Sequence, residues 1–159
     1  MTAIGIRAAT PDDTGYLTTA LASEWQDSTI AAHGELIDLT TLPALIAWRG
    51  TDRVGCVHYQ VTGTSCEIVS LLATVPRIGA GTALLHAIRD LAAARGLDRV
   101  WLVTSNENTG ALAFYQRFGF DLVELRRNAV HAARELKPSI PLEADGIPIR
   151  HELVLELTP

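Results

Sequence analysis

The residues best suited to chemistry lie in the stretch NENTGALAFYQRFGF, residues 106–120. Two asparagines precede a run with helical spacing, and Tyr115 falls on its apolar face beside Phe114. Asn108 is well placed to cap this helix, because its side-chain oxygen can accept a hydrogen bond from a free backbone N–H of the first turn. Capping and core packing would explain these residues by themselves. The alternative is that the helix head faces a ligand and the Tyr115 hydroxyl takes part in a reaction.

A second candidate site is the turn IGAG, residues 78–81, which lies between an expected strand and the strongest helical pattern of the chain. Gly79 and Gly81 let the backbone come close to a ligand, and the free N–H groups of the helix head favour an anion. A phosphate-bearing cofactor is one interpretation, and a simple tight turn is the other. No Gly-Lys-Ser/Thr follows, so the turn is not a P-loop, and Leu84 stands where a dinucleotide fingerprint has its third glycine.

The elements that must position these residues follow from periodicity and turn residues. A strand is expected over Ile4–Ala9, a helix from Pro11 to about Trp25, and a loop with short helical or extended pieces over residues 26–41. Three strands in a meander are expected next, in PALIAWRG, RVGCVHYQV and CEIVSLLA. A helix in PRIGAGTALLHAIRDLAAARG, a strand in DRVWLVT, the helix of residues 106–120 and a strand in FDLVELR follow. The chain then has an expected helix over residues 129–136 and a last strand in RHELVLEL. This order predicts one domain, residues 1–159, with a mixed sheet covered by helices on both faces.

Composition limits the class of function. The chain has 159 residues and a net charge of −5 without a basic block, which argues against a nucleic-acid partner. It shows neither a signal-peptide pattern nor an apolar run long enough for a membrane helix, so we expect a cytoplasmic protein. No metal site is expected. Cys56 and Cys66 are expected to be free buried thiols, because antiparallel pairing would put Cys66 opposite a residue near Gln60, about four residues out of step with Cys56.

The order of strand, Gly-rich turn, long helix, strand, asparagine and tyrosine resembles the GNAT superfamily of N-acetyltransferases. The residues that carry the resemblance are Gly79 and Gly81 of the turn and the pattern N-x-x-A-x-x-x-Y-x-x-x-G-F, formed by Asn108, Ala111, Tyr115, Gly119 and Phe120. The resemblance covers about Val54 to Leu125, and the element order of the whole chain fits. Pro76 stands where members usually carry Gln or Arg, and Arg77 is one position away.

The resemblance implies an α/β fold of the α+β type, in which a mostly antiparallel sheet contains a splayed parallel pair of strands, EIVSLLA and DRVWLVT. It implies acetyl-CoA as cofactor, with the pantetheine amides pairing with backbone groups in the gap as an added strand would. The pyrophosphate would lie on the N–H groups of residues 77–82, and the backbone of residues 71–73 could stabilise an oxyanion. The implied cofactor-binding residues are Leu71, Leu72, Ala73, Arg77, Ile78, Gly79, Ala80, Gly81, Thr82, Asn108, Ala111 and Phe114.

The resemblance also implies catalytic roles. Tyr115 would serve the departing thiolate, and Glu67, on the strand that leads to the turn, would be the base. A tyrosine pKa of about 10 and a thiol pKa of about 8.5 make complete proton transfer unfavourable by roughly 2 kcal/mol, so a hydrogen bond is the safer expectation. His33 and Glu35 are alternative bases, because the early loop usually covers the acceptor.

The expected function is therefore an acetyl-CoA-dependent N-acetyltransferase in which a primary amine of a small-molecule or amino-acid-like acceptor attacks directly. A basic C-terminal part suggests an anionic group on the acceptor, and its Pro-bearing segment is a candidate docking site in a homodimer. The basic residues are Arg126, Arg127, His131, Arg134, Lys137, Arg150 and His151. A non-catalytic acyl-CoA-binding sensor and a plain phosphate-binding α/β domain are the alternatives. The identity of the acceptor, the acyl length and the oligomeric state are left open.

Overall fold

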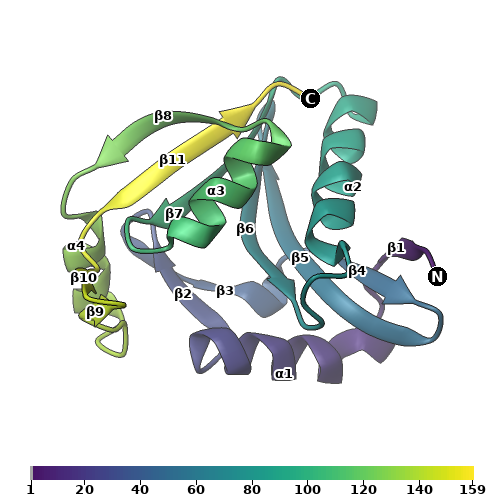
Figure 1. Ribbon diagram of the computed structural model, residues 1–159, viewed down its shortest axis with the longest axis horizontal. Helices are drawn as coiled ribbons and strands as arrows, with labels where there is room; N and C mark the ends of the chain where they lie inside the picture. Colours follow the sequence, from purple (N-terminus) through teal and green to yellow (C-terminus); the bar gives the residue numbers. More distant parts are fainter. Residues whose placement is uncertain (1) are drawn as a thin grey trace.

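A seven-stranded mixed sheet in the order β1-β4-β5-β6-β7-β11-β8 forms the centre of the computed structural model, which describes residues 2–159 (Figure 1). Its strands are β1 (Ile4–Ala8), β4 (Ala44–Arg49), β5 (Asp52–Thr62), β6 (Ser65–Ala73), β7 (Arg99–Ser105), β8 (Asp121–Arg126) and β11 (Glu152–Leu157). All neighbours pair antiparallel except β6 and β7, which run parallel. The expected mixed sheet is confirmed.

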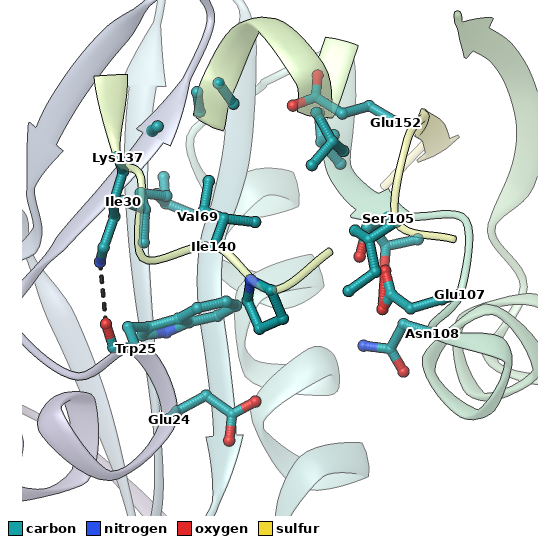
Figure 2. A pocket seen from close by; sticks show the side chains of 18 of the residues that line it. Glu24, Trp25, Ile30, Val69, Ser105, Glu107, Asn108, Lys137, Ile140 and Glu152 are labelled. Carbon is teal, nitrogen blue, oxygen red and sulfur yellow. Dashed lines mark hydrogen bonds between the residues drawn. The ribbon is translucent and has the colours of Figure 1, made fainter. Parts of the chain in front are cut away.

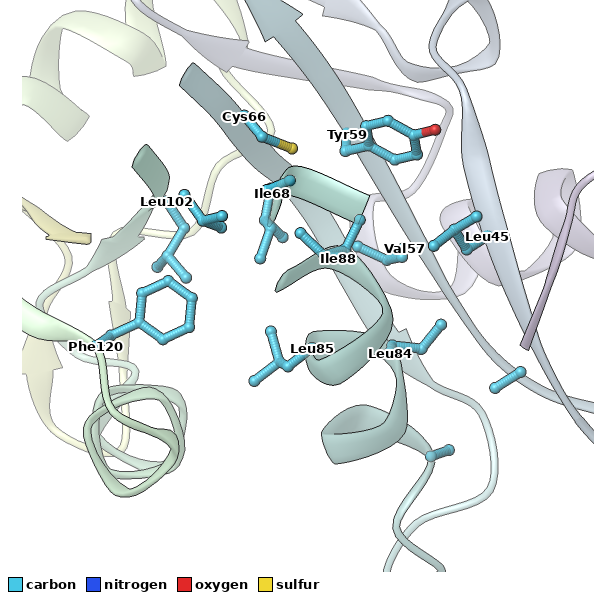
Figure 3. Packing of buried hydrophobic residues seen from close by; sticks show 14 of the residues in the cluster. Leu45, Val57, Tyr59, Cys66, Ile68, Leu84, Leu85, Ile88, Leu102 and Phe120 are labelled. Atoms are coloured by element: carbon cyan, nitrogen blue, oxygen red, sulfur yellow. The ribbon is translucent and has the colours of Figure 1, made fainter. Parts of the chain in front are cut away.

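The helices cover both faces of this sheet, as expected. They are η1 (Pro11–Asp13), α1 (Thr14–Trp25), η2 (Leu39–Thr41), α2 (Ala80–Ala94), α3 (Thr109–Phe118) and α4 (Ala129–Leu136). One face packs on α2 and α3, with Val57, Leu85 and Phe120 in a common core (Figure 3). On the other face, Ile46 and Cys56 pack against α1. Alternation along β4 and β5 sends successive side chains to opposite faces, so both faces are apolar.

The parallel pair β6–β7 is joined over only part of its length. The paired residues run from Ser65 opposite Arg99 to Ile68 opposite Leu102, and the rest of β6 pairs only with β5. Beyond Ile68 the two parallel strands therefore separate. The predicted splay is present, and it leaves a fork between β6 and β7. Glu67 and Ile68 are the last two residues of β6 that pair with β7 before the strands separate.

Two small hairpins stand beside the open side of this fork. The first, β2 (Thr29–Ala32) and β3 (Glu35–Asp38), lies in the segment for which loop with short extended or helical pieces was predicted. The second, β9 (Glu143–Ala144) and β10 (Ile147–Pro148), lies in the Pro-bearing tail and follows α4 (Figure 1). The second hairpin was not predicted, because two residues per strand are too few for a period-2 pattern.

The cysteine prediction is confirmed, with a small change in register. Cys56 and Cys66 are both buried and free. Cys66 lies opposite Val61, one residue from the predicted Gln60, because the β5–β6 pairing shifts between His58 and Tyr59. Burial raises the pKa of the Cys56 thiol to about 12 and that of Cys66 to about 11.

Candidate functional site

A cavity of about 400 Å³ occupies the open side of the fork (Figure 2). Its walls come from β6, β7, the end of α1, the β2–β3 hairpin, α4 and the Pro-bearing tail. The residues that line it include Glu24, Trp25, Ile30, His33, Glu67, Val69, Ser105, Glu107, Asn108, Lys137, Ile140, Pro141 and Glu152. Segments far apart in the sequence therefore meet over the predicted base, Glu67.

Glu67 lies at the fork with only 4% of its surface exposed. Its two carboxylate oxygens are 2.8 and 2.9 Å from Nε2 of His33. Nη1 of Arg126 donates to Nδ1 of the same ring at 3.2 Å. Because a guanidinium can only donate, Nδ1 accepts and the ring proton lies on Nε2, which donates to Glu67. A chain of hydrogen bonds thus runs from Arg126 through His33 to Glu67.

His33 reaches Glu67 because it occupies the turn between β2 and β3 with a left-handed φ of +55°. Its ring also packs on Trp101, with ring centroids 5.4 Å apart. Two of the three candidate bases, Glu67 and His33, are thus neighbours in space. The third, Glu35, is exposed on β3 and is not among the residues that line the cavity.

The turn between β7 and α3 forms another wall of the cavity. The Asn108 side chain accepts a hydrogen bond from the backbone N–H of Ala111 at 3.2 Å, so the predicted cap is confirmed. Asn106 makes different contacts, because its Oδ1 accepts from the backbone N–H groups of Arg150 and His151. Of the two asparagines, one therefore caps the helix and the other fastens the C-terminal segment.

Tyr115 lies on the partly buried face of α3, where its ring contacts Phe114 and Phe120 with centroids 5.3 and 5.7 Å away. Burial raises the pKa of Tyr115 to about 12. This is the opposite of the lowered pKa that complete proton transfer to a thiolate would need. Tyr115 packs against the main core and is not among the residues that line the cavity, and its raised pKa favours donation of a hydrogen bond over complete proton transfer.

The glycine turn approaches the same helix. Gly79 has a φ of +86°, and a Cβ added at Gly81 would lie 3.2 Å from Cζ of Phe114. Gly81 therefore lets the first turn of α2 come close to the Phe114 ring of α3. Arg77 is exposed with a left-handed φ of +62°, and Ala80 is buried in the core.

The remaining predicted cofactor residues extend along this side of the molecule. Leu71, Leu72 and Ala73 line a second hollow of about 370 Å³ next to α1. Ile78 is partly buried on the main core, and Thr82 lies in the first turn of α2. The predicted cofactor residues thus lie at the start of α2, on α3 and its N-cap, and at the end of β6, and those that line a hollow are divided between two separate hollows.

The basic residues of the tail hold the tail in place. Nζ of Lys137 donates to the carbonyl groups of Trp25 and Thr29 and contacts the Asp27 carboxylate at 3.0 Å. The Arg134 guanidinium donates to three tail carbonyls, those of Ile140, Pro141 and Ile149. These contacts give two of the predicted anion-binding residues a structural use.

Sequence analysis missed four acidic or aromatic residues of the cavity: Glu24, Trp25, Glu107 and Glu152. Burial raises the pKa of Glu152, an effect that Arg126 partly offsets. Glu107 lies between Asn106 and Asn108, and capping by Asn108 does not need an acid at this position. Its place in the sequence could therefore have indicated a residue of the cavity. The other three come together only through the tertiary fold.

Two absences within residues 2–159 limit the site. These residues contain no group of three His, Cys, Asp or Glu side chains that could hold a metal ion. Over the same part of the chain, no helix combines the length and apolar character required to cross a membrane.

Comparison with known proteins adds a family and two bacterial relatives. The model of the acetyltransferase (GNAT) family matches residues 11–120. YxbD of Bacillus subtilis (strain 168), an uncharacterized protein, is 46% identical over 103 residues, which span 64% of this chain and 65% of YxbD. YdhI of the same organism, also uncharacterized, is 36% identical over 140 residues, or 87% of this chain and 88% of YdhI.

The fold is also similar to solved structures. A GNAT family acetyltransferase from Elizabethkingia anophelis, solved with acetyl-CoA bound, superposes with a TM-score of 0.72 at 19% identity and covers 98% of both chains. At this identity the likeness concerns the fold. The likeness agrees with a mixed sheet that carries helices on both faces.

Proposed function

Because the chain belongs to the GNAT family of acetyltransferases, we propose that it transfers the acetyl group of acetyl-CoA to a primary amine in the cavity beside Glu67. The amine attacks directly while both substrates are bound. The single observation that carries this proposal is the position of Glu67: a buried carboxylate at the fork, facing a cavity large enough for a small acceptor.

The residues around the fork fit acetyl-CoA. The backbone of β6 beyond Ile68 is unpaired on its β7 side, so it can hydrogen-bond an extended arm in the manner of an added strand. Gly79 and Gly81 open the head of α2, whose first N–H groups suit a pyrophosphate. The cofactor-binding set proposed for this chain is Leu71, Leu72, Ala73, Arg77, Ile78, Gly79, Ala80, Gly81, Thr82, Asn108, Ala111 and Phe114.

Glu67 prepares the amine. An alkyl amine with a pKa near 10.4 attacks in its neutral form and becomes acidic as its nitrogen bonds to the carbonyl carbon. A carboxylate within reach, directly or through one water, can take the proton at that point. His33 donates to Glu67 and fixes the direction of its oxygens. Arg126 fixes His33 in turn. In this arrangement Glu67 is the catalytic base and His33 is a positioning residue.

Tyr115 serves the leaving sulfur by hydrogen bonding. Acetyl-CoA supplies an acetyl group already activated as a thioester. With the pKa of Tyr115 at about 12 and that of a thiol near 8.5, complete transfer of the phenol proton is unfavourable by about 5 kcal/mol. A hydrogen bond to developing negative charge needs no such transfer. Backbone N–H groups of residues 71–73 are the proposed donors for the oxyanion.

Steady-state release of free thiol from acetyl-CoA, measured with a panel of primary amines, tests the proposal. Glu67→Gln should lower kcat by about 100-fold or more, because general base catalysis contributes that much. Tyr115→Phe should lower kcat by about tenfold or more, the worth of one hydrogen bond to a charged group. Tyr59→Phe, which removes the hydroxyl of a tyrosine buried in the core away from the cavity, is the matched control and should keep its rate.

The same experiment separates the non-catalytic alternative. Acetyl-CoA that binds and raises the melting temperature, while no amine of the panel releases thiol, would identify a sensor and end the proposal of catalysis. Turnover with kcat unchanged in both Glu67→Gln and Tyr115→Phe would leave an acetyltransferase whose catalytic residues we have assigned wrongly.

A further inference from the structure

The cavity has more acidic side chains than the transfer of one acetyl group requires. Besides Glu67, the carboxylates of Glu24, Glu107 and Glu152 line it. Glu67 is occupied by His33, and Glu152 lies 3.8 Å from the Arg126 guanidinium. Within residues 2–159, Glu24 and Glu107 form no ion pair. Two carboxylates of the wall thus have no cation from the described part of the chain.

The basic side chain in the wall does not compensate for them. Lys137 is the lysine that lines the cavity, and its ammonium is already shared by two carbonyl groups and by Asp27. Figure 2 shows this side chain directed toward the Trp25 carbonyl on the far side of the cavity from Glu107. The lining therefore favours a cationic ligand over an anionic one.

Glu107 is the sharpest sign of a missing partner. Its Oε1 exposes less than 1 Å² to solvent and has no hydrogen-bond partner in the structure. A buried carboxylate oxygen without a donor costs free energy, so native proteins normally supply one from the chain, water or a ligand. In Figure 2 the carboxylate projects from the turn before α3 into the cavity. Because Oε1 is closed to solvent, a ligand in the cavity would meet the other oxygen of this carboxylate, where a bound ammonium group would balance the charge.

The opposite wall supplies two further features that suit a cation. Glu24 points into the cavity from the end of α1, and the neighbouring Trp25 presents its ring there (Figure 2). Trp25 remains 37% exposed although it is large and apolar, and its indole N–H donates to Oγ of Ser70 at 3.4 Å, which holds the ring. An aromatic face beside carboxylates is a suitable surface for an alkylammonium ion.

Apolar side chains also line this cavity. Ile30, Val69 and Ile140 belong to its lining, and Figure 2 shows them on the side of Lys137, across from Glu107. An acceptor that follows this pattern has an amine at Glu67, a short hydrocarbon segment, and a second ammonium group at Glu107.

We propose that the acceptor is an alkyl diamine whose non-reacting ammonium group is bound by Glu107, with Glu24 and Trp25 on the facing wall. This inference rests on the proposed function, since it names the substrate class of the same site. It replaces the anionic acceptor suggested by the basic tail, whose Lys137 and Arg134 are used within the chain. Glu107 acts here in specificity and has no part in the bond-making step.

The test compares three acceptors that share a four-carbon chain: 1,4-diaminobutane, butylamine and 4-aminobutyrate. Wild type should acetylate the diamine with a kcat/KM about tenfold or more above that of butylamine, the worth of one charge-assisted hydrogen bond. Glu107→Gln keeps the shape of the side chain and should bring this ratio close to one. Glu135→Gln removes an exposed carboxylate of α4 that does not line the cavity, and it should keep the wild-type ratio.

Calorimetric titration of the diamine into the protein without acetyl-CoA measures diamine binding, and so tests the inference separately from turnover. Binding by wild type that weakens about tenfold in Glu107→Gln supports the diamine site even if no thiol is released, in which case the proposed function alone fails. A diamine no better than butylamine, a preference for 4-aminobutyrate, or an unchanged ratio in Glu107→Gln would overturn the inference. So would a rise in the KM of acetyl-CoA in Glu107→Gln with the acceptor ratio kept, because Glu107 would then serve a pantetheine amide.

Discussion

Glu67 shows at the scale of one residue how a buried carboxylate is kept ready for a ligand. It lies in the sheet, where both of its chain neighbours pair with other strands, so its backbone is held in place. Its side chain has one hydrogen-bond donor, the His33 ring, and faces the cavity on its other side. A group held in this way can exchange one partner for another without rearrangement of the fold.

Arg126 allows the positioning role of His33 to be tested. Arg126→Gln removes the donor to Nδ1 of His33, so the ring can turn over and Glu67 loses its fixed partner. We expect kcat to fall several-fold, and the free energy of unfolding to change by less than about 1 kcal/mol, because the lost ion pairs are partly exposed. Initial rates with saturating substrates, together with urea unfolding, measure the two quantities.

Arg99→Gln is the matched control for this prediction. The Arg99 guanidinium lies over the Trp101 ring at 4.7 Å, as that of Arg126 does at 5.9 Å, and it also has an ion pair, with Glu156. Its side chain bonds to Glu156 and not to His33. Equal losses of kcat in both variants would mean that packing on Trp101 matters and the hydrogen bond to His33 does not.

At the scale of elements, the fork forms because β6 and β7 pair with each other over a shorter length than with their outer neighbours. β6 has β5 beside it along its whole length, whereas β7 pairs with β6 for four residues and with β11 for six. Each parallel strand is therefore held by its outer neighbour while the inner pairing ends at Ile68 and Leu102. The opening is stable because neither strand depends on the other for its remaining hydrogen bonds.

The elements themselves were largely predictable, and the assembly of the site was not. Periodicity and turn residues located the strands of the sheet and helices α1 to α4, because each signal lies within about ten residues. The motif with Asn108 and Tyr115 indicated the family for the same reason. The contact between His33 and Glu67 spans 34 positions. It depends on a left-handed turn residue at His33 and on the docking of the β2–β3 hairpin, neither of which leaves a local pattern.

The contact between α2 and α3 leads to a second prediction. Gly81→Ala places a methyl group against the Phe114 ring, so this ring must move by a few tenths of an ångström and the KM for acetyl-CoA should rise several-fold. Gly110→Ala is the matched control, because it also replaces a glycine in the first turn of a helix but meets nothing within 4 Å. It should stabilise the protein by about 0.5–1 kcal/mol through helix propensity and leave the KM unchanged. A KM that is the same in both variants would show that Gly81 and Phe114 do not form a cofactor wall.

For the whole molecule, the tail has a role that composition did not indicate. The Pro-bearing segment contributes Ile140 and Pro141 to the cavity wall, and Lys137 fastens it to the end of α1. The proposed acceptor site thus combines residues of α1, of the sheet and of the tail. A homodimer remains a prediction. The edge strand β8, with its exposed Leu122 and Leu125, is a second surface to examine when sedimentation measurements give the oligomeric state.

The two cysteines offer a measure of whether acetyl-CoA binds the folded molecule as a whole. Both thiols are fully buried on opposite faces of the sheet, and burial raises the pKa of Cys56 to about 12 and that of Cys66 to about 11. Because an unfolded thiol ionises near pH 8.5, these raised values make stability fall as the pH rises above about 8.5. Alkylation at about pH 7.5 therefore avoids this loss, and it requires opening of the core.

Acetyl-CoA at 100 times its Kd should slow the alkylation of both cysteines by about 100-fold, which corresponds to roughly 2.7 kcal/mol of stabilisation. Mass spectrometry of peptides distinguishes alkylation of Cys56 from alkylation of Cys66. The control is the same alkylation with ATP in place of acetyl-CoA at the same concentration. Protection of both cysteines by acetyl-CoA alone is the expected result, because the unfolding that exposes both buried thiols also separates β6 from β7 and destroys the fork. Equal protection by ATP would indicate a general phosphate-binding domain, and protection of neither cysteine would mean that the fork does not bind the cofactor.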